Sequence, residues 1–346
     1  MKKHFKRALS LLLAILLCIG MLPVSASAAD LTGSMSMIDI KSRDHALSSS
    51  LPAPFGGYAS EKYTMLRITD SSTGATKTAY CLELGISTYY QEQYRSSADY
   101  PQFSQEQKEL INAVLTLGYN TDTGVKYGGS PEDEYIATQI LVWLIAHKQL
   151  GTQYENQIVS EFTVNSPGAK AVFTKLRKAV MDYRTIPSFA CEDSKYASSH
   201  TYELKYNAQT GKYETTLTDS NGVLSEFSFS QPGVSFARTG NQLKISSEKT
   251  SFSTVSGEKK LPSSIAGVVK GASRYWLNEH YQNVVTFEVG GEPLPVKAYF
   301  GLEVKAGHLK IVKTSEDGKV SGLPFHVSGS GVEKDVSTGP DGTVQT

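Results

Sequence analysis

Two short runs of polar and apolar residues early in the chain are rich in the residue types that favour β-strands. The runs cover residues 63–68 and 76–82, and the segment between them, Asp70-Ser-Ser-Thr-Gly74, has the composition of a turn. Two such runs around a glycine-containing turn predict a β-hairpin. Cys81 then lies at the end of the second strand.

Three helices are predicted after the hairpin, because apolar residues recur there at helical spacing. N-cap serines, two of them followed by proline, mark their starts: Ser104, Ser130 and Ser166. The residues expected to end the helices are Gly118, Gly151 and Pro187. Residues 61–187 are therefore predicted to form one α+β domain.

After Pro187 the pattern changes to short alternating runs that are separated by glycine and asparagine turns. Residues 202–206, 213–217 and 293–300 are such runs, with the spacing of a β-sandwich. Residues 188–305 are therefore predicted to form an all-β sandwich domain. Residues 306–346 begin another strand pattern at 308–313, and they are expected to be the truncated first part of an Ig-like or prealbumin-like β domain.

The first 28 residues have the pattern of a secretory signal peptide. A basic head precedes the apolar run 11–22, and Ala26-Ser-Ala28 is a cleavage site of small residues. The run is shorter than the roughly 20 residues of a membrane-spanning helix, and no later run approaches that length. We therefore expect a secreted mature chain without a membrane span, in which the Ser- and Pro-containing residues 29–60 are a linker.

Charge and composition exclude one class of partner. The 346 residues carry 34 Lys and Arg against 34 Asp and Glu, so no polyanion-binding surplus exists and nucleic acid is not an expected partner. The histidines lack metal-ligand spacing and no glycine-rich phosphate loop is present, so neither a metal nor a cofactor is expected.

Export gives the two cysteines outside the leader two interpretations. Thiols outside the cytoplasm usually oxidise, so a structural stalk with a Cys81–Cys191 disulfide is one of them. The other is that Cys81 is a nucleophile. In that case Cys191, just after Pro187, is left as a free thiol.

Gln139 suggests the partner of that nucleophile. On the second helix it lies within an apolar stripe with Tyr135, Val142 and Trp143, so its amide needs a hydrogen-bond partner there. A core glutamine bonded to the backbone would satisfy this need. Alternatively, attack of the Cys81 thiolate on the amide would release ammonia and form an internal thioester, with Tyr80 and Trp143 excluding water.

These residues resemble a known family. Tyr80-Cys81-Leu82 and the later Thr138-Gln139-Ile-Leu-Val-Trp143 are similar to the motifs of thioester domains in Gram-positive surface adhesins. The resemblance implies that Cys81 and Gln139 form the thioester, in a pocket with Tyr80, Thr138 and Trp143. It also implies a non-enzymatic adhesin on a Gram-positive cell surface or cell wall, which covalently captures amines of a host surface molecule.

A second resemblance concerns the third unit. Its start, Gly307-His-Leu-Lys-Ile-Val-Lys313, is similar to that of SpaA/Cna B-type stalk domains of pili and adhesins. There the matching lysine, Lys313 in this chain, forms an isopeptide bond with an asparagine near the domain's end. That asparagine would lie beyond residue 346, in a possible continuation of the stalk.

His147 supports a rival from another class. It follows Trp143 by one helical turn, so a Cys81–His147 pair could serve a cysteine acyltransferase or peptidase. A histidine near a helix C-terminus is also favoured by the helix dipole without any catalytic role.

Overall fold

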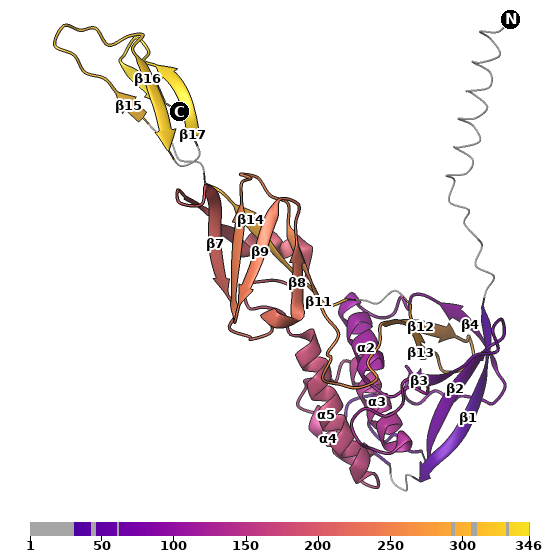
Figure 1. Cartoon of the computed structure of the whole chain (residues 1–346). Helices are drawn as coiled ribbons and strands as arrows, with labels where there is room; N and C mark the ends of the chain where they lie inside the picture. The colour runs from indigo at the N-terminus through magenta and orange to yellow at the C-terminus, as the bar shows by residue number, and fades with distance from the viewer. Residues whose placement is uncertain are drawn as a thin grey trace, which may run out of the picture.

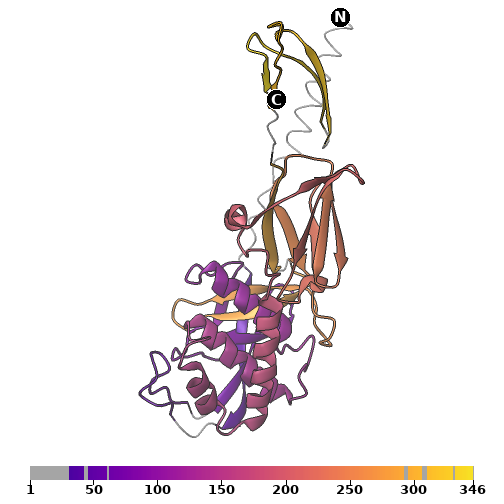
Figure 2. The ribbon, with the colours of Figure 1, turned by 90° about the vertical axis from the view of Figure 1, so that its left-hand side faces the viewer.

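A computed structural model describes residues 31–42, 46–60, 62–291, 295–305, 310–329 and 332–345. Figure 1 shows three units in succession, a unit of helices and strands, a β-sandwich and a smaller unit of strands. Figure 2 shows the same succession from the side. The predicted leader, residues 1–28, lies outside the described residues, and so does the start of the third unit at residues 306–309.

Six strands close a barrel in the first unit, in the order β1-β2-β3-β13-β12-β4. Their bounds are Thr32–Ser42 for β1, Lys62–Asp70 for β2, Thr76–Cys81 for β3, Gln93–Ser97 for β4, Gly271–Leu277 for β12 and Val284–Val289 for β13. β2 and β3 pair antiparallel with Leu66 opposite Ala79, which confirms the predicted hairpin.

Strand β1 corrects the interpretation of residues 29–60 as a linker. It pairs with β2 along most of its length and with β4 at its start. Met35 alternates with Ser34 and Ser36, and its side chain is buried in the cluster that fills the barrel. The strand was not predicted because small polar residues on the outer face of a strand, such as these serines, have the composition of a loop.

Strands β12 and β13 correct the expectation that residues 188–305 belong wholly to the sandwich. β13 pairs with β3, with Val284 opposite Cys81, and β12 pairs with β4, with Tyr275 opposite Ser97. The chain therefore leaves the first unit, builds most of the sandwich and returns to close the barrel. Local alternation predicts a strand but not the sheet that it joins.

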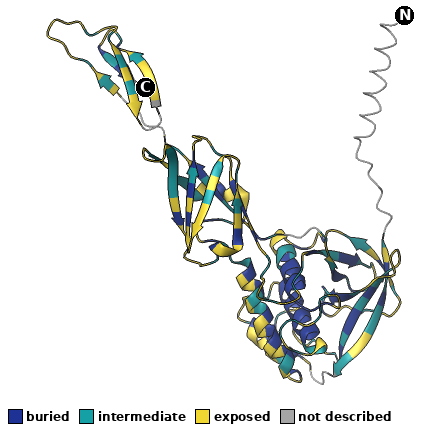
Figure 3. Cartoon of the chain, viewed as in Figure 1, coloured by how far each residue is buried: buried dark blue, intermediate teal, exposed yellow. Residues whose placement is uncertain are grey.

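Four helices lie beside the barrel strands in Figure 1: α2 at Gln105–Leu117, α3 at Pro131–Ala146, α4 at Glu155–Phe162 and α5 at Pro167–Arg184. The three predicted helices are present, and the capping box of Ser104 with Gln107 is formed. Helix α3 ends at Ala146, earlier than the expected stop at Gly151, and α4 was not predicted. Figure 3 shows α3 as the most buried helix, and all of residues 134–145 are buried.

The sandwich consists of two four-stranded sheets, β6-β7-β10-β9 and β5-β14-β11-β8. The strand bounds are Thr201–Glu203 for β5, Lys205–Asn207 for β6, Lys212–Thr218 for β7, Phe227–Ser230 for β8, Val234–Thr239 for β9, Gln242–Ser247 for β10, Val255–Lys259 for β11 and Lys297–Glu303 for β14. Short 3₁₀ helices lie at Ser194–His200 and Leu224–Glu226. Lys259 joins sandwich and helices, because its Nζ donates to the Asp182 and Thr185 carbonyls at the end of α5, at 2.7 and 2.8 Å.

The third unit has two pairs of strands, β15 with β18 and β16 with β17. Their bounds are Lys310–Val312 for β15, Pro324–Gly329 for β16, Val332–Ser337 for β17 and Thr343–Gln345 for β18. In the part of the chain that the structure describes, no helix is both long enough and apolar enough to cross a membrane.

Candidate functional site

The scaffold of the candidate site is the contact between strand β3 and helix α3. Tyr80 of β3 stacks on Tyr135 of α3, with ring centroids 4.9 Å apart. The Tyr135 hydroxyl donates to the Ala79 carbonyl at 3.0 Å and accepts from the Leu66 N–H at 3.1 Å. Tyr135 therefore connects α3 to both strands of the hairpin. This fixes the position of the helix along its axis, its height, relative to the end of β3.

At that height Gln139 meets the main chain of Cys81. Its Oε1 accepts from the Cys81 N–H at 2.8 Å, and its Nε2 donates to the Cys81 carbonyl at 2.9 Å. Gln139 is only 3 % exposed. The amide is therefore bonded to the backbone, as the structural alternative requires, and the backbone that it contacts is that of the candidate nucleophile.

A cavity of about 330 Å³ opens beside this pair. Both Cys81 and Gln139 line it, together with Tyr135, Trp143 and the segment 85–88. A larger groove of about 770 Å³ lies between α4 and α5, but neither of the two residues lines it. The smaller cavity is therefore the one in which an external molecule could reach the pair.

The thiol of Cys81 is not acidic. Burial raises its pKa well above the usual value, and the nearby Glu83 carboxylate acts in the same direction. The neutral thiol is the weaker nucleophile. Any reaction at this site consequently depends on the placement of the amide and on transfer of the thiol proton.

Comparison with known proteins finds one family model that is similar to part of the chain. Residues 78–181 match the thioester domain family. Both Cys81 and Gln139 lie within the matched residues. The match supports a function that is mediated by a thioester.

Two solved structures resemble the chain. One is the thioester domain of the Staphylococcus aureus TIE protein, at 14% identity and a TM-score of 0.43, covering 79% of this chain and 100% of that one. The other is the Bacillus anthracis TIE protein, at 16% identity and a TM-score of 0.35, covering 91% of this chain and 57% of that one. A search of curated proteins finds no match.

The other predicted pocket residues of the thioester domain have different surroundings. Trp143 lines the cavity and stacks on Phe162, with centroids 5.3 Å apart. Tyr80 is buried behind the cavity, where its hydroxyl donates to the Tyr119 carbonyl. Thr138 is fully buried, donates to the Glu134 carbonyl and accepts from the Tyr119 N–H. Only Trp143 of these three borders the space beside Cys81, while Tyr80 and Thr138 hold the loop at Tyr119.

His147 has a main-chain partner. It is the C-cap of α3, and its Nε2 accepts from the Leu84 N–H at 3.2 Å. Burial lowers its pKa below the ordinary value, and it does not line the cavity. Because Nε2 accepts from the backbone, the proton of the neutral ring lies on Nδ1, so neither nitrogen offers a free lone pair to the thiol, which does not favour a Cys81–His147 dyad.

Several residues that support the thioester domain were not predicted. Glu83 accepts from the Tyr100 hydroxyl, from the Asn283 N–H and from the Asn283 side-chain amide, at 2.9, 2.9 and 3.0 Å. Gln282 lines the cavity and donates to the Glu83 carbonyl. Only Glu83 carried a local signal, its position two residues after Cys81. Gln282 and Asn283 come from the distant β12–β13 connection.

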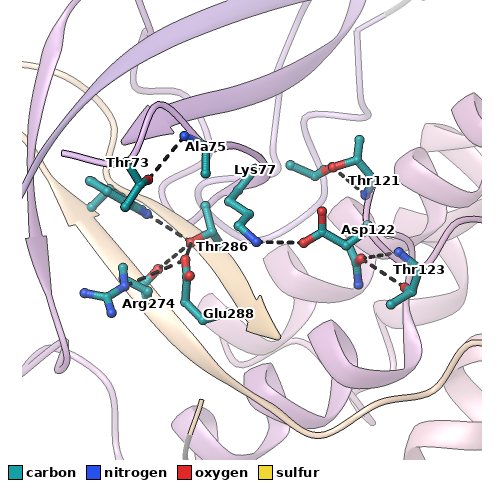
Figure 4. A network of polar contacts seen from close by, with 12 residues as sticks. Thr73, Ala75, Lys77, Thr121, Asp122, Thr123, Arg274, Thr286 and Glu288 are labelled. Carbon is teal, nitrogen blue, oxygen red and sulfur yellow. Dashed lines mark hydrogen bonds and ion pairs between the residues drawn. The ribbon is translucent and has the colours of Figure 1, made fainter. Parts of the chain in front are cut away.

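Polar contacts also lie near the start of strand β3 and on the neighbouring strand β13. Figure 4 shows Lys77 and Asp122 pointing toward each other, and their ion pair measures 2.7 Å. In the same view the Thr286 hydroxyl of β13 lies between Glu288 and the Arg274 carbonyl, and it donates to Glu288 at 3.1 Å. The Lys77–Asp122 ion pair joins the loop at Asp122 to β3, and the Thr286 contacts lie within β13 and between β13 and β12.

The remaining candidates lie apart from this site. Cys191 and Cys81 are both free thiols, so the predicted disulfide alternative is not formed. Lys313 follows β15, and its N–H donates to the Gly342 carbonyl. Among the described residues, no group of three or more His, Cys, Asp or Glu is arranged to hold a metal ion.

Proposed function

We propose that Cys81 and Gln139 form an internal thioester and that the protein uses it to capture an amine covalently. The observation that supports this most strongly is the pair of hydrogen bonds between the Gln139 amide and the Cys81 main chain. They hold the carboxamide beside the residue that carries the thiol. Such placement can replace several kcal/mol of the barrier, because the reacting groups need not be brought together.

In the first step the Cys81 sulfur attacks Gln139 Cδ. Negative charge develops on Oε1, which already accepts from the Cys81 N–H, so this N–H acts as an oxyanion donor. The bond from Cδ to Nε2 then breaks, and the thiol proton moves to Nε2, which leaves as ammonia. The step needs no further reactant, because the thiol supplies the proton that the leaving group takes.

In the second step an incoming primary amine attacks the thioester carbonyl. A new amide bond to Gln139 forms, the bond to sulfur breaks, and the amine proton returns the Cys81 thiol. The Gln139 acyl group is consumed in the new amide, so each protein acts once. This is binding by a covalent bond and not turnover.

The setting of this reaction is proposed from the sequence. The leader pattern of residues 1–28 and the resemblance to adhesins support a secreted protein on the surface of a Gram-positive bacterium, with an amine of a host surface molecule as target. Residues 306–346 would begin a stalk. Ile311 and Lys313 are half-buried while Lys310 and Val312 are exposed, as expected for a lysine on the inner face that awaits an isopeptide partner.

Intact mass of the mature, non-reduced protein tests the proposal. The thioester gives a mass lower than the sequence by one ammonia, and methylamine then adds its own mass. A Gln139→Ala variant should show neither change, whereas the matched control Gln149→Ala should behave as the unmodified chain does. A mass lower by two hydrogens would indicate the Cys81–Cys191 disulfide and contradict the proposal.

A further inference from the structure

The loop between β3 and β4 exposes large apolar side chains at one place. Ile86, Tyr89 and Tyr90 are 48 %, 53 % and 61 % exposed, within five consecutive positions. Single exposed apolar residues are common on protein surfaces, but neighbouring ones indicate a contact surface. We call residues 85–91 the rim loop.

The backbone of the rim loop is anchored at both ends. Ser87 accepts from the Gln282 N–H at 3.1 Å, and the Gln91 N–H donates to the Met35 carbonyl at 2.8 Å. The Tyr89 ring also lies against the Tyr281 ring, with centroids 4.7 Å apart. Aromatic side chains on an anchored loop lose little conformational entropy on binding, which makes them effective contact residues.

The rim loop is continuous with the cavity that holds the candidate thioester. Its residues 85–88 form part of the lining, and the exposed Tyr89 and Tyr90 follow directly in the chain. A molecule whose amine enters the cavity therefore has its remaining atoms next to these tyrosines. The molecule that contacts the rim loop is therefore the same one whose amine enters the cavity.

We propose that the rim loop binds the polypeptide around the captured lysine and selects lysines with apolar or aromatic neighbours. This rests on the proposed covalent capture. A polypeptide is favoured over a glycan for two reasons. Ile86 is a branched aliphatic side chain that packs on apolar side chains, and the Tyr89 ring is inclined by 54° to Tyr281 rather than extending one flat stacking platform.

The test measures rates of adduct formation on the full mature chain by intact mass. The probes are methylamine and two N-acetylated tripeptide amides, Phe-Lys-Phe and Ser-Lys-Ser. We expect the phenylalanine peptide to react at least about fivefold faster than the serine peptide. A Tyr89→Ser/Tyr90→Ser variant should lose this preference and keep its methylamine rate, which also shows that it is folded. Tyr90→Ser alone should lose part of the preference.

Tyr196 provides the matched control, since it is 55 % exposed on the sandwich. Tyr196→Ser should keep the preference. Equal rates for both peptides in the unmodified chain, or a preference that survives in the double variant, would overturn the proposal. So would glucosamine reacting faster than both peptides in a way that needs Tyr89 and Tyr90, because the surface would then serve a glycan. If methylamine forms no adduct with any variant, the thioester itself is refuted and the selection falls with it.

Discussion

The two free cysteines lie in regions that look alike locally and differ in one respect. Cys81 of β3 pairs with Val284 of the neighbouring strand β13, and Cys191 forms an isolated bridge with Tyr299 in the sandwich. Burial raises the pKa of both thiols. Around Cys191 the sulfur meets only carbonyl oxygens of Asp193 and Tyr299, each at 3.3 Å. At Cys81 the side-chain amide of Gln139 is hydrogen-bonded to the main-chain N–H and carbonyl of the cysteine.

This comparison separates acidity from reactivity. Neither region offers the cationic surroundings that stabilise a thiolate, so thiol acidity does not distinguish the two cysteines. A carbonyl of the main chain is part of a peptide bond in a strand and does not act as an acyl donor here. The carboxamide of Gln139 can lose ammonia, and it is held in place by two hydrogen bonds. In the proposed reaction the acyl partner, rather than the thiol, makes the Cys81 region the reactive one.

The largest expected effect comes from removing each thiol. Cys81→Ser should abolish the loss of ammonia and the methylamine adduct, because a serine hydroxyl forms an ester far less readily than a thiol forms a thioester at this site. Cys191→Ser should leave both unchanged. Intact mass measures each variant. A methylamine adduct that survives in Cys81→Ser and disappears in Cys191→Ser would assign the chemistry to the Cys191 region and refute the comparison.

A smaller effect is expected from the tyrosines that brace the two regions. Tyr135→Phe removes the partner of the Ala79 carbonyl and the Leu66 N–H, both buried, and should lower the free energy of unfolding by about 1–3 kcal/mol. It should also slow thioester formation, because the height of α3 is no longer fixed. Denaturant unfolding and the rate of ammonia loss measure these changes.

The matched control in the other region is Tyr202→Phe. The Tyr202 hydroxyl donates to a single carbonyl, that of Phe189, at 2.8 Å, and the side chain is only half-buried. The loss of stability should be smaller than for Tyr135→Phe, and thioester formation should not change. Equal slowing by both substitutions would mean that global stability, and not the position of α3, controls the reaction.

The smallest effect is a pH dependence of the Cys81 region. Burial lowers the pKa of His147 below its ordinary value of 6.5. As the pH falls below 6.5, the unfolded chain binds more protons than the folded one. The free energy of unfolding therefore decreases as the pH decreases in that range. His147→Gln should remove this contribution, because glutamine does not titrate. Its amide oxygen can still accept from the Leu84 N–H, so the hydrogen bond is kept. Denaturation curves between pH 7.5 and 5 test this, and His280→Gln, at an exposed position, serves as control. A pH slope that persists in His147→Gln would contradict the assignment.

Much of the site could be predicted from the sequence because its signals are local. The serines at 104 and 130 mark helix starts by hydrogen bonds to residues three positions on, and both bonds are formed. The apolar positions around Gln139 predict its burial, and the β-prone residues 76–82 predict the strand that ends in Cys81. Thr138 and Tyr80, in contrast, were expected in the pocket because of their neighbours in sequence, and they face the loop at Tyr119 instead.

The sequence by itself determined the helix caps at Ser104 and Ser130, the hairpin, and the placement of a cysteine at a strand end and of a glutamine in a buried position, because these depend on residues a few positions apart. Only the tertiary structure decided that the Gln139 amide meets the Cys81 main chain, that β12 and β13 return to the barrel, and that His147 is bonded to Leu84. These contacts join residues far apart in the chain. Their geometry follows from the packing of α3 against the barrel, and no local pattern encodes it.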